Sequence, residues 1–147
     1  MADAIGDQSA ELNRQREDHP ISPATLTGIA KRGDTTCQHA LFILRWLGRA
    51  PESFLSPVLR VAEDASMPAG GSDRRLRWDL PALYAALDAQ RRDRQLTWGA
   101  AAKELRCSEH QLKGIRTARF AINMKLAMRL VQWLGRPASH FVYVAKW

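Results

Sequence analysis

Apolar residues recur with helical spacing in the stretch 97–117, which divides into two short segments around a tight turn. In the first segment Ala101, Ala102 and Leu105 lie on one face of a helix, because their spacing follows the helical period. Thr97 precedes them, and its hydroxyl can accept a hydrogen bond from a backbone N–H at the helix start. We therefore expect a short helix that begins at Thr97 and packs closely through its small residues.

The second segment, 108–117, has its own start signal. Ser108 is followed three residues later by Gln111, so the hydroxyl and the amide can satisfy each other's free backbone donors in a capping box. Leu112 and Ile115 point inward from the same helix. The outer face consists of polar residues that have no predicted core to pack against: Glu109, His110, Lys113 and Thr117. This pattern indicates a helix with one exposed face suited to binding.

A further helix is predicted after this pair, and it begins after Asn123 as its cap. A short helix opens at Pro137. The chain then ends FVYVAKW, for which two interpretations remain open: a last helix packed on the domain, or an edge strand able to pair with another chain. The helix is favoured at the start of this tail, and the last five residues stay open.

The run from Leu80 to Phe141 resembles the DNA-binding domain of the Cro and phage-repressor family, also called the XRE family. The matching motifs are LPALYAALDAQ, the LT step at 96–97, AAKEL, SEHQLKGI and MKLAMRLVQWLG. The resemblance covers about half of the chain and implies an all-α, five-helix domain that inserts the helix 108–117 in the DNA major groove. It further implies a sequence-specific, double-stranded DNA-binding transcriptional regulator, expected to be a repressor.

The resemblance also implies roles for individual side chains. Glu109 would accept from a cytosine amino group, Lys113 would donate to guanine, and His110 would do either, with Thr117 further along the same face. Phosphate contacts are expected from the edges of the motif, where the candidates are Arg94, Thr97, Arg116, Arg119 and Lys125. The competing interpretation is that all of these residues are merely solvated on an exposed surface.

One position departs from the family pattern. The family usually has glycine where this chain has Arg106, at the point where the second helix ends in a left-handed conformation. Either the turn is strained, or its geometry differs from that of the family.

The first half of the chain contains a second copy of the same unit. SPATLTGI at 22–29 aligns with SEHQLKGI at 108–115, and after a one-residue slip ALFILRWLGRAPESF at 40–54 aligns with AMRLVQWLGRPASHF at 127–141. Self-similarity at a fixed offset indicates a duplicated supersecondary unit. The counterpart of the outer binding face is poor in side chains that read bases: Pro23, Ala24, Thr27 and Lys31.

This copy is incomplete. Carried back at the same offset, its first helix would begin before Met1, and its second would fall on 11–19. There Gln15, Arg16 and His19 occupy the packing positions, and polar groups cannot close that core without partners. The predicted organisation is a polar N-terminal segment at 1–20, a partial repeat at 21–57, a linker at 58–75 and a complete helix-turn-helix domain at 76–147.

Charge is distributed unevenly between the halves. Residues 1–73 carry 7 Lys and Arg against 10 Asp and Glu, whereas residues 74–147 carry 15 against 5, which together give the net charge of +7. A basic half that contains a helix-turn-helix is the electrostatic signature of a phosphate-binding surface. The alternative is a basic face that serves only solubility.

Other chemistry has little support in the sequence. Cys37 and Cys107 cannot form a disulfide framework, and with no apolar leader or long apolar run we expect a cytoplasmic protein without a membrane role. No phosphate loop, nucleophile with a base or carboxylate pair is recognisable, so we expect no enzyme activity, no cofactor and no metal.

Two arrangements on DNA are open. One is a homodimer, formed through the incomplete copy or the aromatic tail, and the other is a single chain that uses both copies in tandem. The charge imbalance favours the homodimer. The main rival function is a protein-binding adaptor or antitoxin-like module that keeps the fold, and a third is non-specific binding of nucleic acid through charge alone.

Overall fold

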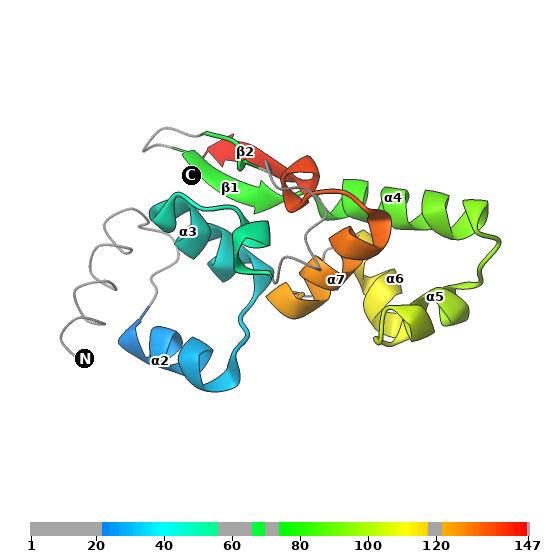
Figure 1. The fold of residues 1–147 in the computed structure, drawn as a ribbon, viewed down its shortest axis with the longest axis horizontal. Helices are drawn as coiled ribbons and strands as arrows, with labels where there is room; N and C mark the ends of the chain where they lie inside the picture. The colour runs from blue at the N-terminus through cyan, green and yellow to red at the C-terminus, as the bar shows by residue number, and fades with distance from the viewer. Residues whose placement is uncertain (1–21, 56–65, 70–73, 118–121, 147) are drawn as a thin grey trace.

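The computed structural model describes residues 22–55, 66–69, 74–117 and 122–146 (Figure 1). The described chain is mostly helical with a small two-stranded sheet, so the expectation of a mainly helical class is confirmed. The predictions made for residues 1–20, for most of the linker and for Arg119 lie outside the described residues.

The second half contains α4 (Leu80–Asp93), α5 (Trp98–Glu104), α6 (Glu109–Thr117) and α7 (Met124–Leu134), followed by the short 3-10 helix η3 (Ala138–Phe141). Each of the four α-helices is preceded by a residue whose side-chain oxygen accepts a backbone hydrogen bond from the first turn. These capping residues are Asp79, Thr97, Ser108 and Asn123. The helix starts are therefore fixed locally, as the cap residues in the sequence indicate.

A two-stranded antiparallel sheet pairs β1 (Arg74–Trp78) with β2 (Val142–Lys146). The all-α expectation missed this sheet. Leu76 and Trp78 are buried while Arg77 between them is exposed, which is the period-two pattern of a strand. In the C-terminal tail the helix favoured at its start was wrong beyond Phe141, the last residue of η3, because Val142–Lys146 form a strand. That strand pairs with β1 of the same chain.

The first half contains α2 (Pro23–Arg32), α3 (Cys37–Leu47) and the 3-10 helix η1 (Pro51–Phe54). These elements repeat α6, α7 and η3 in order, and α3 and α7 are each 11 residues long. Both end at a left-handed glycine, Gly48 with φ 64° and Gly135 with φ 65°, where a side chain would be strained. The same local signals therefore build the same helices in both copies.

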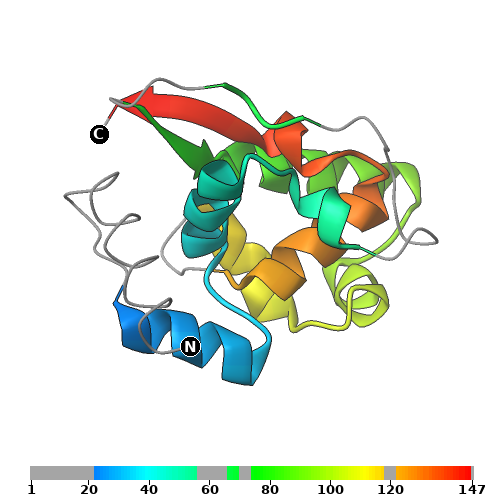
Figure 2. The same cartoon turned by 60° about the vertical axis from the view of Figure 1, so that its left-hand side comes forward.

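The two halves share one hydrophobic core. Cys37 and Leu41 of α3 lie in the same buried cluster as residues of α4 to α7 and of the sheet. The Trp78 indole N–H donates to the carbonyl of Cys37 at 3.0 Å, and the Gln38 amide donates to the carbonyl of Leu76 at 2.7 Å. In both Figure 1 and Figure 2, α3 lies between α2 and the sheet. The partial repeat is thus attached to the second half through α3.

Candidate nucleic-acid interface

The candidate interface centres on α6, which is held in place by its N-terminal cap and by its buried inner face. The capping box forms as the sequence indicates: Ser108 Oγ accepts from the backbone N–H of Gln111 at 3.1 Å, and Gln111 Oε1 accepts from the backbone N–H of Ser108 at 2.9 Å. Leu112 and Ile115 are both 0% exposed in the core. One face of α6 is therefore buried in the core, while the other is exposed to solvent.

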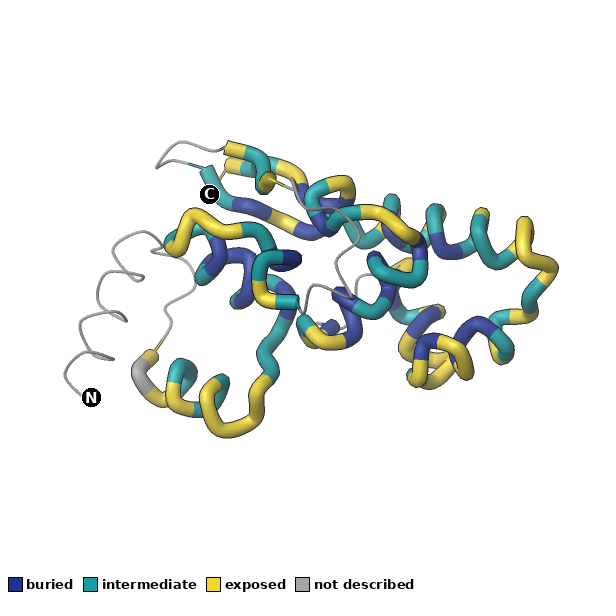
Figure 3. The backbone as a smooth tube through the Cα atoms, viewed as in Figure 1, coloured by how far each residue is buried: buried dark blue, intermediate teal, exposed yellow. Residues whose placement is uncertain are grey.

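Along α6 two buried positions, Leu112 and Ile115, stand among positions that are exposed or half-buried (Figure 3). Glu109, His110, Lys113 and Thr117, the four predicted base-contacting residues, are all exposed. The structure also pairs two of them, because the Lys113 ammonium forms an ion pair with the Glu109 carboxylate one turn away. Thr117 Oγ1 donates back to the carbonyl of Gly114 at 3.1 Å.

The turn before α6 keeps the left-handed conformation. Arg106 has φ 51°, so the first of the two alternatives left by the sequence holds: the geometry is retained and a non-glycine residue occupies it. Such a residue costs about 1–2 kcal/mol. Arg129 Nη1 donates to the carbonyl of Arg106 at 2.9 Å, and the backbone N–H of Cys107 donates to the carbonyl of Ala102 at 3.0 Å. These bonds stabilise the turn and fix the angle between α5 and α6.

The predicted phosphate contacts occupy different environments. Thr97 caps α5, where its Oγ1 accepts from the backbone N–H of Ala100 at 3.1 Å. Arg116 is exposed in the last turn of α6, and Lys125 is exposed in the first turn of α7. Thr97 and Arg116 therefore belong to the two helices of the candidate interface. Lys125 lies instead near the first repeat, where its backbone N–H donates to Asp34 Oδ1 at 3.2 Å.

Arg94 is already engaged within the protein. Its guanidinium donates two hydrogen bonds to the Glu104 carboxylate, at 2.8 and 3.2 Å, and lies 5.1 Å from the centre of the Trp133 ring. The Trp133 indole N–H also donates to Glu104, at 2.8 Å. This bond, together with those from Arg94, lowers the pKa of Glu104 below its ordinary value. Arg94 thus helps to join α4, α5 and α7, and its phosphate contact stays a prediction.

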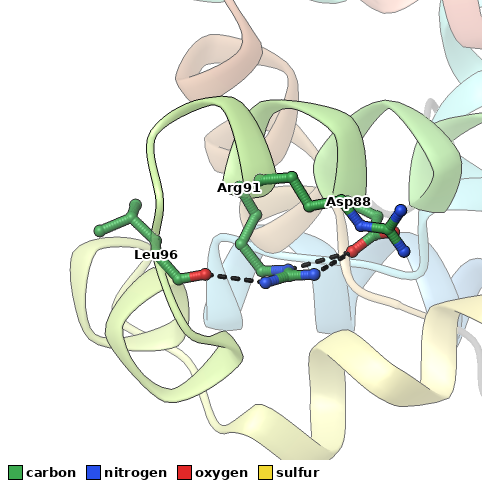
Figure 4. A network of polar contacts seen from close by, with 4 residues as sticks. Asp88, Arg91 and Leu96 are labelled. Carbon is green, nitrogen blue, oxygen red and sulfur yellow. Dashed lines mark hydrogen bonds and ion pairs between the residues drawn. The ribbon is translucent and has the colours of Figure 1, made fainter.

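Arg91 is a structural residue that the sequence reasoning missed. Its guanidinium donates to Asp88 Oδ1 through Nε at 3.0 Å and Nη2 at 2.6 Å, and to the carbonyl of Leu96 at 2.8 Å through Nη1 (Figure 4). These bonds fix the loop that leads from α4 to the cap of α5. The spacing of Asp88 and Arg91 on one helix was the available signal, whereas the bond to Leu96 depends on the turn of the loop.

Cys37 and Cys107 are both free thiols. Within the described ranges, no group of three or more His, Cys, Asp or Glu residues is placed to hold a metal ion. Burial raises the pKa of the Cys37 thiol to about 12, and burial also raises that of Cys107, against the opposing effect of Arg129. Both thiols are therefore poor nucleophiles at neutral pH.

Comparison of the chain with protein-family models, with curated proteins and with solved structures finds no match. Among the described helices, none is long and apolar enough to cross a membrane.

Proposed function

We propose that the protein is a sequence-specific, double-stranded DNA-binding transcriptional regulator that acts as a repressor in the cytoplasm. In this proposal α5, the turn at Arg106 and α6 form the helix-turn-helix of a Cro-like or repressor-like domain, and residues 108–117 enter the major groove. One observation carries it. The outer face of α6 is polar and exposed, while its inner face, at Leu112 and Ile115, is fully buried.

The ion pair between Glu109 and Lys113 is compatible with base contacts. Both side chains are about half exposed, at 45% and 57%, so water screens their attraction. An exposed pair of this kind contributes about 0.3–0.5 kcal/mol. A good contact to a base edge contributes about 1–3 kcal/mol, so it can replace the pair at a net gain. Glu109 would then accept from cytosine and Lys113 would donate to guanine.

Positive charge supports the same proposal. Residues 74–147 carry 15 Lys and Arg against 5 Asp and Glu, and Arg116 adds an exposed guanidinium directly beside the base-reading face. Phosphates would be neutralised by Arg116 and other cations at the edges of the motif. We therefore expect the affinity for DNA to fall steeply as salt rises.

The test is selection from a randomised duplex library at near-physiological salt with the full chain. Beside it runs the double variant Lys113→Ala and Arg116→Ala, with Arg136→Ala and Lys146→Ala as a control that removes the same charge from exposed positions outside α6. We expect the wild-type and control proteins to enrich one defined site and the α6 variant to enrich none. Equal enrichment by both variants, or binding that fades with salt and shows no sequence preference, contradicts the proposal.

A second candidate function is a protein-binding adaptor or antitoxin-like module. It is favoured by an apolar groove of about 780 Å³ between the first repeat and α7, lined in part by Leu47 and Phe54, which are 44% and 56% exposed. The two functions use different surfaces. A Leu47→Asp variant would leave DNA selection unchanged if the regulator proposal holds, and would abolish capture of a protein partner if the adaptor proposal holds.

A further inference from the structure

The two halves of the chain meet in a reciprocal pair of backbone hydrogen bonds. The N–H of Cys37 donates to the carbonyl of Ile122 at 2.8 Å, and the N–H of Met124 donates to the carbonyl of Thr35 at 2.7 Å. Thr36 and Asn123 lie between these bonds and form an isolated antiparallel bridge. The contact therefore joins the start of α3 directly to the start of α7.

The two bonds are equivalent in the repeat: replacing each residue by its counterpart in the other copy converts one bond into the other. At the offset that aligns Ala40 with Ala127, Thr36 occupies the position of Asn123, and its two neighbours occupy the positions of the neighbours of Asn123. Thr36 and Asn123 are also the N-caps of α3 and α7. A contact in which i meets j and j meets i is the signature of a two-fold interface between identical subunits. Here it occurs inside one chain.

This local two-fold relation assigns a counterpart to the proposed DNA-reading helix. In the order of the repeat α2 precedes α3 as α6 precedes α7, so α2 is the counterpart of α6. In Figure 1, α2 lies below α3, and the α5–α6 pair lies beside α7 toward the other end of the molecule. A dimer that reads two half-sites likewise places one recognition helix in each of its two halves.

The outer face of α2 has its own chemistry for a base edge. Ala24, Thr27 and Lys31 are exposed at the positions that correspond to His110, Lys113 and Thr117 of α6. The methyl groups of alanine and threonine suit contact with the thymine methyl in the major groove. Two cations, Lys31 and Arg32, lie in the last turn, where phosphates can be reached.

The first half as a whole carries an excess of acidic residues, which would repel DNA, but this excess comes from segments outside the described repeat. Residues 22–55 carry four Lys and Arg, at 31, 32, 45 and 49, against two acidic residues, Asp34 and Glu52. Glu52 is only 4% exposed, so it contributes little negative surface. The acidic excess of the first half therefore lies in residues 1–21 and 56–73. The described part of the first repeat is itself basic.

We infer that a single chain occupies two successive major-groove turns of one duplex, with α6 on one half-site and α2 on the other. The inference rests on the proposed DNA-binding function, and it replaces the homodimer favoured by the charge imbalance. The predicted site is not palindromic. One half is read by charged side chains of α6, and the other, about one helical turn away, is rich in A·T pairs and is read by methyl groups of α2.

The test uses the full chain and the duplex selected from the library. We expect one chain per duplex by analytical ultracentrifugation, and hydroxyl-radical protection over two successive turns on one face. The double variant Thr27→Asp and Lys31→Ala removes the threonine methyl and makes the net charge two units less positive. It should lose protection at the A·T-rich half alone and bind about 5-fold more weakly, whereas Lys113→Ala should affect the other half alone. Insertion of about 5 base pairs between the halves moves one to the opposite face and should weaken binding as strongly as loss of that half.

Circular dichroism melting curves would check that each variant is folded. The Arg136→Ala and Lys146→Ala double variant serves as the charge control. Two chains on a palindromic site, or protection of one turn only, overturns the single-chain inference and leaves the proposed function standing. A failure of the library to enrich any site is a different result, which overturns the proposed function itself.

Discussion

Two corresponding apolar positions are exposed in the first repeat and buried in the second. Leu47 and Phe54 are 44% and 56% exposed, whereas Leu134 and Phe141, at the corresponding positions, are 9% and 3% exposed. The helices that carry them are alike in length and in their glycine C-caps. Local sequence therefore decides that a helix forms here, and the neighbouring elements decide whether its apolar face is buried.

The difference arises from α4 and α5, which cover the second repeat. Leu83 and Leu87 of α4 and Ala101 and Ala102 of α5 belong to the same core cluster as α7. No described residue range supplies the counterpart of these two helices over α3, and the groove, which α3, η1 and α7 line together, lies there instead. α3 packs in addition against β1 of the sheet and against the start of α7.

The largest expected effect comes from truncation of the paired phenylalanines. Phe141→Ala should lower the free energy of unfolding by about 3–5 kcal/mol, because it leaves a cavity in a closed core. Phe54→Ala should cost less than about 1 kcal/mol, since it removes mainly an exposed ring that the Arg49 guanidinium overlies at 4.4 Å. Urea unfolding measures both. Similar costs would mean that a segment outside the described ranges, or a partner, covers the groove in solution.

The next effect tests the contact between the two 3-10 helices. Glu52 in η1 is buried, and its Oε1 accepts from the backbone N–H of Ala138 in η3 at 2.5 Å. Glu52→Ala should cost about 1–3 kcal/mol of unfolding free energy, because that N–H loses its acceptor. Glu52→Gln keeps a carbonyl oxygen as acceptor for this N–H and should retain most of the unfolding free energy. Ser139→Ala, at the corresponding position of η3, is the matched control and should change stability by less than about 0.5 kcal/mol.

Local elements were predictable from the sequence to a greater extent than their pairing. The caps at Thr97, Ser108 and Asn123 marked the helix starts, because each signal is read within one turn of the chain. The β1–β2 sheet and the bond from Glu52 to η3 join segments far apart in the sequence, and no local pattern specifies such a partner. The exposed face of α6 was predictable from the sequence, because its polar positions have no apolar residues to pack against.

Sequence reasoning also missed contacts at the candidate interface, most of them between segments that are distant in the chain. The Glu109–Lys113 ion pair follows from their spacing on one helix, so it was within reach of the sequence. The contact of Arg94 with Glu104 and Trp133 depends on how three helices pack. The reciprocal bonds at Thr36 and Asn123 could not be foreseen either, because a repeat does not reveal how its copies meet.

A smaller effect is expected from backbone strain at non-glycine residues, which among the described residues occurs in the second half. The left-handed residues of the described first repeat are Gly33 and Gly48, whereas the second half places Gln95 and Arg106 in that region, at φ 54° and 51°. Arg106→Gly should raise the free energy of unfolding by about 1 kcal/mol, because glycine adopts this conformation without a Cβ clash. Lys103→Gly, inside α5, should have the opposite sign and lower it by about 1 kcal/mol. Destabilisation by both would mean that the Arg106 side chain makes a contact that outweighs the strain.

The smallest effect is a pH dependence that distinguishes the two corresponding tryptophans, Trp46 and Trp133. Only Trp133 donates its indole N–H to Glu104, and this bond, with Arg94, lowers the pKa of Glu104 from its ordinary value of 4.5. A carboxylate with a lowered pKa in the folded state stabilises the fold above its ordinary pKa, and this contribution is lost as the pH falls through the folded-state value. Glu104 is solvent-accessible, so the change is small.

The matched variants are Trp133→Phe and Trp46→Phe, with unfolding free energies measured at several pH values on both sides of 4.5. Both substitutions change packing at every pH, so the informative quantity is the slope against pH. Trp133→Phe should flatten the acid slope because the pKa of Glu104 returns toward its ordinary value, whereas Trp46→Phe should leave the slope as in the wild type. An unchanged slope in Trp133→Phe would assign the acid sensitivity to another carboxylate. A flattened slope in Trp46→Phe would show that the first repeat, despite its missing cover, also holds a stabilising carboxylate.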